Sequence, residues 1–128
     1  MNDISVTRLE KRAWTHETIQ TVERLVAARG AWGRDMLGDE LLRCDELYLG
    51  MGENGPCAFL LVARVRLPVG PERRDARYLG LGAAQDEAGG AAVMAQFTAD
   101  ARSEEERRRT RLVLFTTSAM PLAFTSRF

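Results

Sequence analysis

The segment YLGLGAAQDEAGGAAVMAQF, residues 78–97, changes character halfway along its length. It opens as an apolar run that two glycines interrupt, passes through a polar turn, QDE at 85–87, and reaches a glycine pair at 89–90. The residues that follow, AAVMAQF, are typical of a helix. The segment therefore predicts a strand, a tight turn rich in glycine and the start of a helix.

The glycine pair has two interpretations. Glycine lets a chain turn sharply between a strand and a helix, and such turns account for most short glycine motifs. Glycine also lets a ligand approach backbone N–H groups, and the partial positive charge at a helix N-terminus favours an anion such as phosphate. The residues leave both interpretations open, with the simple turn favoured when the segment stands alone.

The rest of the chain alternates between strand and helix patterns. Period-two alternation or apolar runs predict strands at 4–9, 46–51, 57–67, 77–83 and 112–116. Helices are predicted from the N-cap residue Thr15 to a stop at Gly30, and again at 35–43 and 91–109. A polar loop is predicted at 68–75. Hairpins come first and a β-α-β unit comes last, which predicts an α/β domain with a mixed, mainly antiparallel sheet and flanking helices.

The bulk composition restricts the class of protein. A chain of 128 residues is expected to form one domain, 1–128, and its 18 basic and 18 acidic residues give a formal net charge of zero. A chain without net charge lacks the general positive field with which many proteins attract nucleic acids. No apolar run approaches the roughly 20 residues that a helix needs to span a membrane. Cys44 and Cys57 have no metal-ligand spacing, which favours reduced thiols. We expect a cytoplasmic protein that binds no nucleic acid, membrane or metal.

The turn and the order of elements resemble the GNAT superfamily of acyl-CoA-dependent N-acyltransferases. In that family the fourth strand leads through a loop of pattern Q/R-x-x-G-x-G/A into a long helix. The sequence QDEAGG matches this pattern at Gln85 and Gly90 and departs from it at Ala88, where the family has its first glycine. The hairpin at 45–62 resembles the second and third strands of the family, and the segment at 112–124 resembles the fifth strand and the helix that follows it.

The resemblance implies a cofactor, acetyl-CoA or another acyl-CoA, and a site for it. The residues implied to bind the cofactor are Leu81, Ala83, Gln85, Ala88, Gly89 and Gly90. Backbone groups near the first two would bond the pantetheine arm, and the amides of the last three would hold the pyrophosphate. The acceptor implied by the family is a small-molecule or peptide amine.

Two departures from the family bear on activity and assembly. Many members carry a tyrosine on the helix after the fifth strand, as the acid that protonates the departing thiolate, whereas the best-matching position here is Phe124, which has no proton to donate. The family also continues with two further strands, and this sequence ends at Phe128. The resemblance therefore implies a shortened domain. The apolar run at 112–116 suits a central strand, so we expect a second copy, another chain or a rearranged tail to cover its outer edge.

Candidates for a catalytic base are carboxylates. Glu46 and Glu87 could deprotonate an amine, as could Asp86, although most such side chains are simply solvated. His16, the one histidine, begins a predicted helix and is expected to face solvent. Two functions stay open: acetyl transfer from acetyl-CoA to an amine, or a non-catalytic, shortened GNAT-like module that binds a partner chain.

Overall fold

The computed structural model describes residues 3–28, 31–109 and 111–116. They form a five-stranded sheet in the order β1-β2-β3-β4-β5. The strands are β1 (Ser5–Glu10), β2 (Glu46–Gly52), β3 (Gly55–Val69), β4 (Glu72–Ala84) and β5 (Val113–Thr116). The first four pair antiparallel, and β5 lies parallel to β4. The predicted mixed, mainly antiparallel sheet is confirmed.

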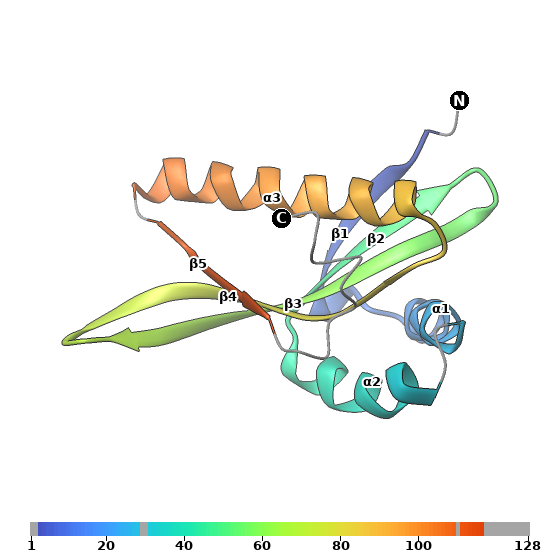
Figure 1. The fold of residues 1–128 in the computed structure, drawn as a ribbon, viewed down its shortest axis with the longest axis horizontal. Helices are drawn as coiled ribbons and strands as arrows, with labels where there is room; N and C mark the ends of the chain where they lie inside the picture. Colours follow the sequence, from blue (N-terminus) through green and yellow to red (C-terminus); the bar gives the residue numbers. More distant parts are fainter. Residues whose placement is uncertain (1–2, 29–30, 110, 117–128) are drawn as a thin grey trace.

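Helices cover both faces of the sheet (Figure 1). They are a single 3-10 turn (Lys11–Ala13), α1 (His16–Ala27), α2 (Ala31–Arg43) and α3 (Glu87–Arg108). Helices α1 and α2 lie against one face and α3 crosses the other (Figure 1). The side chain of Thr15 accepts a hydrogen bond from the amide of Thr18, which confirms the predicted cap of α1.

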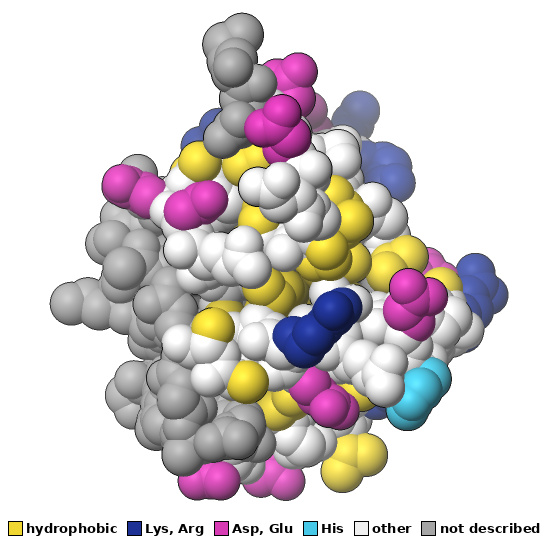
Figure 2. All heavy atoms as spheres, turned by 90° about the vertical axis from the view of Figure 1, so that its right-hand side faces the viewer, with side chains coloured by type: hydrophobic (Ala, Val, Ile, Leu, Met, Phe, Trp, Pro, Cys, Tyr) yellow, Lys and Arg dark blue, Asp and Glu magenta, His cyan; other side chains and the backbone are white. Residues whose placement is uncertain are grey.

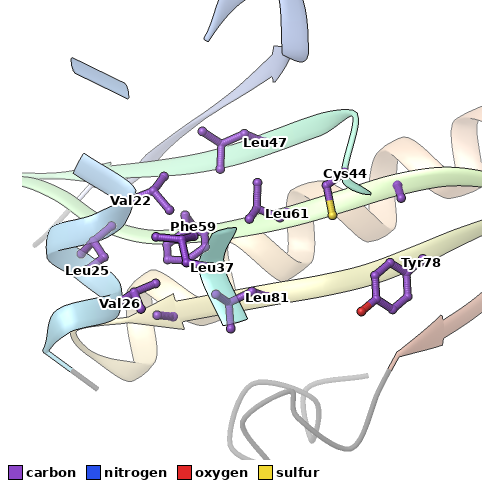
Figure 3. Close-up of a cluster of buried hydrophobic side chains, with 12 residues drawn as sticks. Val22, Leu25, Val26, Leu37, Cys44, Leu47, Phe59, Leu61, Tyr78 and Leu81 are labelled. Atoms are coloured by element: carbon purple, nitrogen blue, oxygen red, sulfur yellow. The ribbon is translucent and has the colours of Figure 1, made fainter. Parts of the chain in front are cut away.

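The core consists of two clusters, one on each face of the sheet. On the side of α1 and α2 the buried residues are Val22, Leu25, Val26, Leu37, Cys44, Leu47, Phe59, Leu61, Ala63, Tyr78, Leu81 and Ala83 (Figure 3). On the side of α3 they are Tyr48, Cys57, Ala58, Leu60, Val62, Leu79, Ala84, Val93, Met94 and Phe97. The apolar run of β3 contributes alternately to both clusters, because helices cover the sheet on both sides.

Three predicted boundaries were wrong. The segment 68–75 is not a polar loop, because β3 and β4 continue through it and pair as far as Val69 and Glu72. Beyond the pairing with β2, which reaches Val62, and the pairing with β5, which begins at Ala76, β3 and β4 form a two-stranded arm (Figure 1). Helix α2 begins at Ala31, four residues earlier than predicted. Helix α3 begins at Glu87, not at 91, so the glycine pair lies inside its first turn.

Strand β5 lies at one edge of the sheet in the part of the chain that the structure describes. There β5 is the last strand of the sheet and pairs with β4 alone. Leu114 is 39% exposed. An apolar run can belong to an edge strand as well as to a central one, and the run alone does not distinguish them. The predicted helix stop at Gly30 and the substitution at Phe124 lie outside the described residues.

Candidate functional site

Strand β4 contains a bulge at the centre of the sheet. Leu60 pairs with Gly82 and Val62 pairs with Leu79, so two residues of β4, Gly80 and Leu81, oppose a single residue of β3. A bulge places consecutive residues on one face and bends the strand. Leu81 belongs to the cluster under α1 and α2, and Gly80 contacts side chains of α2 and of the residue after it. The bulge therefore turns two adjacent residues toward the same face.

The pairing of β4 with β5 ends close to the bulge. The last pair joins Leu79 to Thr116. Within the described residues, no strand adjoins β4 on that side at Leu81 or Ala83, which are 2% and 3% exposed. These two residues, implied to bind a pantetheine arm, thus lie where β4 leaves its parallel neighbour.

The N-terminus of α3 is closed by a carboxylate. Asp86 is the N-cap residue, and its Oδ1 accepts a hydrogen bond of 2.7 Å from the amide of Gly89. The amide of Gly90 donates to the carbonyl of Asp86 at 3.3 Å, as the first bond of the helix. The amide of Gln85 donates to the carbonyl of Cys57 at 2.8 Å, which ties the turn to β3. Two of the amides implied to hold a pyrophosphate therefore already have partners.

Gly89 is required for packing. A Cβ atom added there would lie 3.0 Å from Sγ of Cys57 and 3.3 Å from Cβ of Ala58. The missing side chain of Gly89 therefore favours the close approach of α3 to β3 at this point. The residues of the turn that face outward are 85–88, whereas the glycine pair is buried.

The charge at this end of α3 is negative. The charged residues of the turn are Asp86 and Glu87, both exposed. Figure 2 faces this end of the molecule and shows several acidic side chains, in magenta, together with a basic side chain, in dark blue, near the centre of the view. Acidic residues in the first turn stabilise a helix through its dipole, but they also compete with any anionic ligand.

Glu46, one of the two predicted bases, is engaged in ion pairs. It is buried on the side of α3, where it pairs with Arg8 and with Nε of Arg64 at 2.7 Å. Burial acts to raise the pKa of this carboxyl, but the hydrogen bonds from the two guanidinium groups outweigh it and lower the pKa. A carboxylate with a lowered pKa is a weak proton acceptor near neutral pH.

Glu87 and His16 both lie at helix starts. Glu87 is exposed in the first turn of α3, beside the cap of the helix. His16 is the first residue of α1 and is exposed, as predicted. The structure does not bring Glu87 and Glu46 together, because Glu87 begins α3 whereas Glu46 lies beside Asp100, more than three turns further along that helix.

Sequence reasoning missed Glu40. This residue of α2 is 2% exposed, and its Oε1 accepts a hydrogen bond of 2.9 Å from the hydroxyl of Tyr78 on β4. Its Oε2 contacts the bulge at Gly80. One signal was available, because Glu40 stands three residues after Leu37 and therefore shares the buried face of α2.

The backbone of the chain superposes on several solved N-acetyltransferases. A ribosomal-protein-alanine N-acetyltransferase from Brucella melitensis biovar Abortus matches with a TM-score of 0.60 at 15% identity, over 98% of this chain and 89% of that one. The aminoglycoside N-acetyltransferase AAC(6')-Iy, in complex with CoA, matches with a TM-score of 0.57 at 13% identity, over 92% and 80% of the two chains. An aminoglycoside acetyltransferase from an uncultured soil sample, in complex with sisomicin, has a TM-score of 0.56 at 13% identity, over 90% and 77%.

The chain has the GNAT fold. No family model and no curated protein matches the sequence itself. The likeness therefore lies in the arrangement of helices and strands, at identities where similar backbones carry different side chains. Strands β1 to β5 and helices α1 to α3 follow in the order that the resemblance predicted.

In this GNAT fold, the region of the β4 bulge is compatible with an acyl-CoA, whereas the N-terminus of α3 is less so. Among the described residues, β4 passes its bulge and leaves the pairing with β5 at the place implied for the pantetheine arm. At α3 a pyrophosphate would first have to displace the carboxylate of Asp86 from the amide of Gly89. The loss of such a cap costs about 1 kcal/mol, which the charge-assisted hydrogen bonds of a phosphate can offset.

Neither a metal cluster nor a membrane-spanning helix is found in the residues that the structure describes. They contain no cluster of His, Cys, Asp and Glu side chains that could hold a metal ion. Among them, no helix has both the length and the apolar character that a membrane span requires.

Proposed function

We propose that this chain binds an acyl-CoA along β4 and transfers the acyl group to an amine. The observation that carries the proposal is the bulge at Gly80 and Leu81, next to the point where β5 stops pairing with β4. A strand whose backbone is not used by a neighbour on one side can hydrogen-bond an extended ligand such as a pantetheine arm. The same fold was solved with CoA bound in AAC(6')-Iy.

Each implied residue has a role in this proposal. Backbone groups at Leu81 and Ala83 bond the pantetheine arm, and a strand amide beside them polarises the thioester carbonyl. The pyrophosphate is held by the amides of Ala88, Gly89 and Gly90 once the side chain of Asp86 has turned away. Gln85 is the first residue of the turn that presents these amides. When bound, the acyl-CoA supplies an activated acyl group for attack by an amine.

The acceptor class is a small-molecule or peptide amine. Structures with this fold include a complex with the aminoglycoside sisomicin and a NatC complex bound to a Gag peptide and CoA, the latter with a TM-score of 0.50. Both acceptor types offer a nucleophilic nitrogen. The reaction requires that nitrogen to be neutral, and therefore requires a proton acceptor close to the thioester.

The test compares two donors. Calorimetry is expected to show saturable binding of both acetyl-CoA and acetyl-pantetheine, with acetyl-CoA tighter because it adds the pyrophosphate contacts at α3. Release of free thiol from acetyl-CoA should then depend on an added amine from a panel of aminoglycosides and peptides. A folded chain that binds neither donor at millimolar concentration would contradict the proposal.

The acid-capped helix favours a second function, that of a non-catalytic module. The carboxylate of Asp86 accepts the hydrogen bond of the Gly89 amide, and Glu87 adds a second negative charge. Both features disfavour binding of an anion at the N-terminus of α3. Such a module would bind a partner chain or a second copy along β5, where Leu114 is partly exposed. If the variant D86N, which lacks the charge of Asp86, also failed to bind an acyl donor, the result would favour this second function.

A further inference from the structure

The charges of this chain are distributed unevenly along it. Segments 64–77 and 102–111 together contain ten arginines and five carboxylates, whereas the rest of the chain contains eight basic and 13 acidic residues. The net charge of zero is therefore an average over a basic part and an acidic part. The argument from net charge against an attraction to nucleic acid does not hold for the basic part by itself.

The two arginine-rich segments meet in the fold. The first contains the arm of β3 and β4, and the second contains the C-terminal end of α3 and the residues that lead to β5. Arg77 of β4 donates to Glu104 of α3, and Arg108 of α3 pairs with Asp75 of β4. The described residues of the two segments therefore form one surface, the basic end, where the arm reaches beyond α3 (Figure 1).

A groove of the basic end runs between the arm and α3. Arg64 lies opposite Arg77 and Arg66 lies opposite Asp75, so these four side chains share the face of the arm that is turned toward α3. The groove has a volume of about 230 Å³ and is lined by Arg64, Arg66, Arg77 and Arg108, together with Val65 and Asp75. Guanidinium groups of β3, β4 and α3 are thus gathered around one open space.

Most arginines of the basic end have no acidic partner. Four of the ten pair with Glu46, Asp75 or Glu104. The other six are exposed and form no ion pair with any described residue: Arg73, Arg74, Arg102, Arg107, Arg109 and Arg111. Six positive charges are therefore free to contact an anionic partner.

The basic end suits a partner that binds through charge alone. Among the described residues, the exposed large hydrophobic side chains are Leu42 and Leu114, and neither belongs to the basic end. Protein interfaces are anchored by aromatic and apolar side chains, and a membrane surface is bound by inserting such side chains. Segments 64–77 and 102–111 contain no aromatic residue on which an unpaired base could stack. A nucleic-acid duplex fits best, because it offers dense phosphates while its bases stay stacked.

We propose that the basic end binds the phosphate backbone of a nucleic-acid duplex without regard to base sequence. The exposed arginines donate charge-assisted hydrogen bonds to phosphate oxygens, to which the planar guanidinium group is well matched. The acid-rich remainder of the chain is repelled by the same phosphates, so the molecule approaches the duplex with the arm foremost. This inference does not depend on the proposed acyl transfer.

The binding test uses two labelled duplexes of about 20 base pairs, one of DNA and one of RNA, in fluorescence anisotropy from about 50 to about 200 mM salt. At least one duplex should bind, with an affinity that does not change when its base sequence is scrambled. The logarithm of the association constant should fall against the logarithm of the salt concentration with a slope of about −3 or steeper, because each neutralised phosphate contributes about −0.9.

Two double variants locate the interface. R73Q with R74Q on the arm, and R102Q with R107Q on α3, should each weaken binding by at least about tenfold and make the salt slope shallower by about 2. The matched control is R12Q with R24Q, which removes two exposed arginines outside the basic end and should change the affinity by less than about twofold. Circular dichroism establishes that each chain is folded, and if one of the two variants is not, the other carries the test.

Several results would overturn the inference. One is a wild-type chain that binds neither duplex at about 50 mM salt, and another is a control pair that weakens binding as much as the arm pair does. Vesicles rich in phosphatidylserine that bind as tightly as the duplexes would assign the basic end to a membrane surface instead. A salt-dependent dimer that R73Q with R74Q abolishes, in the absence of duplex binding, would assign it to a second copy. All of these results leave the proposed acyl transfer standing.

Discussion

Arg77 on β4 donates a hydrogen bond of 2.5 Å to Glu104 on α3, and the two side chains are only 6% and 11% exposed. This ion pair joins the strand that carries the bulge to the far end of the helix that carries the glycine turn. Burial acts to raise the pKa of the Glu104 carboxyl, but the hydrogen bond and charge of Arg77 outweigh it and lower the pKa. Glu104 also accepts from Arg108 at 3.2 Å.

Loss of the Glu104 charge should destabilise the fold. E104Q leaves the guanidinium of Arg77 buried without its counter-charge, and we expect a loss of about 3 kcal/mol in the free energy of unfolding. Urea denaturation measures it, with E106Q on the exposed side of α3 as a control expected to stay within about 0.5 kcal/mol. Replacement of both partners, R77M with E104M, should restore most of the loss. An unchanged midpoint in E104Q would contradict a buried pair.

Acid should weaken the fold through Glu46 and Glu104. Both carboxyls have a folded-state pKa lowered from 4.5, so each contributes stability that is fully present above the unfolded pKa. That contribution is lost as the pH falls through the folded-state pKa of each group. Unfolding free energies measured from about pH 7 down to about pH 3 should fall below about pH 4.5. The fall should be shallower in E46Q and in E104Q, whereas equal slopes in all three chains would count against these ion pairs.

Replacement of Gly80, at the bulge, by alanine should destabilise the fold. G80A would press a Cβ atom against Glu40 and Cys44, and we expect a destabilisation of about 1–3 kcal/mol. The matched control is G38A on α2, where nothing lies within 4 Å of an added Cβ atom and where the chain is helical. G38A should stabilise the chain by about 0.4–1 kcal/mol. Thermal unfolding of both variants gives the comparison, and a stabilised G80A would mean that Glu40 does not contact the bulge.

The charge of Asp86 should limit binding of an anionic cofactor. In D86N the side chain still caps α3 but no longer repels a pyrophosphate. We expect affinity for acetyl-CoA to rise by about two- to fivefold while affinity for acetyl-pantetheine stays the same, both measured by calorimetry. The control is D39N, which removes an acidic charge from α2. Weaker binding of acetyl-CoA by D86N would show that the pyrophosphate does not reach this helix.

The outer edge of β5 should mediate self-association. Leu114 is 39% exposed on the last strand of the described sheet, and an uncovered edge favours pairing with another strand. Light scattering at low micromolar concentration should detect a dimer in the wild type and a monomer in L114K, with both chains equally folded by circular dichroism. A monomeric wild type over the same range of concentration would remove this edge as an interface.

Local patterns in the sequence were sufficient for the order of the elements. The hydroxyl of Thr15 caps α1 as the residue type predicts. The segment 78–97 correctly predicted a strand, a turn and the start of a helix, although the glycine pair lies inside the first turn of α3 and not in the turn before it. Such features depend on residues that are neighbours in the chain, so they can be predicted from a short stretch of sequence.

Only the tertiary structure could show which distant groups meet. The bulge at Gly80 depends on the register of β4 against β3, and no residue within β4 specifies that register by itself. The contact of Glu40 with Tyr78 joins residues 38 positions apart, and it buries a carboxylate between α2 and β4. Glu104 belongs to a charge-dense segment, 104–109, yet it is buried because it pairs with Arg77 on β4. Packing brings such partners together after the helices and strands have formed, and that is why the chemistry of the site is absent from any local pattern.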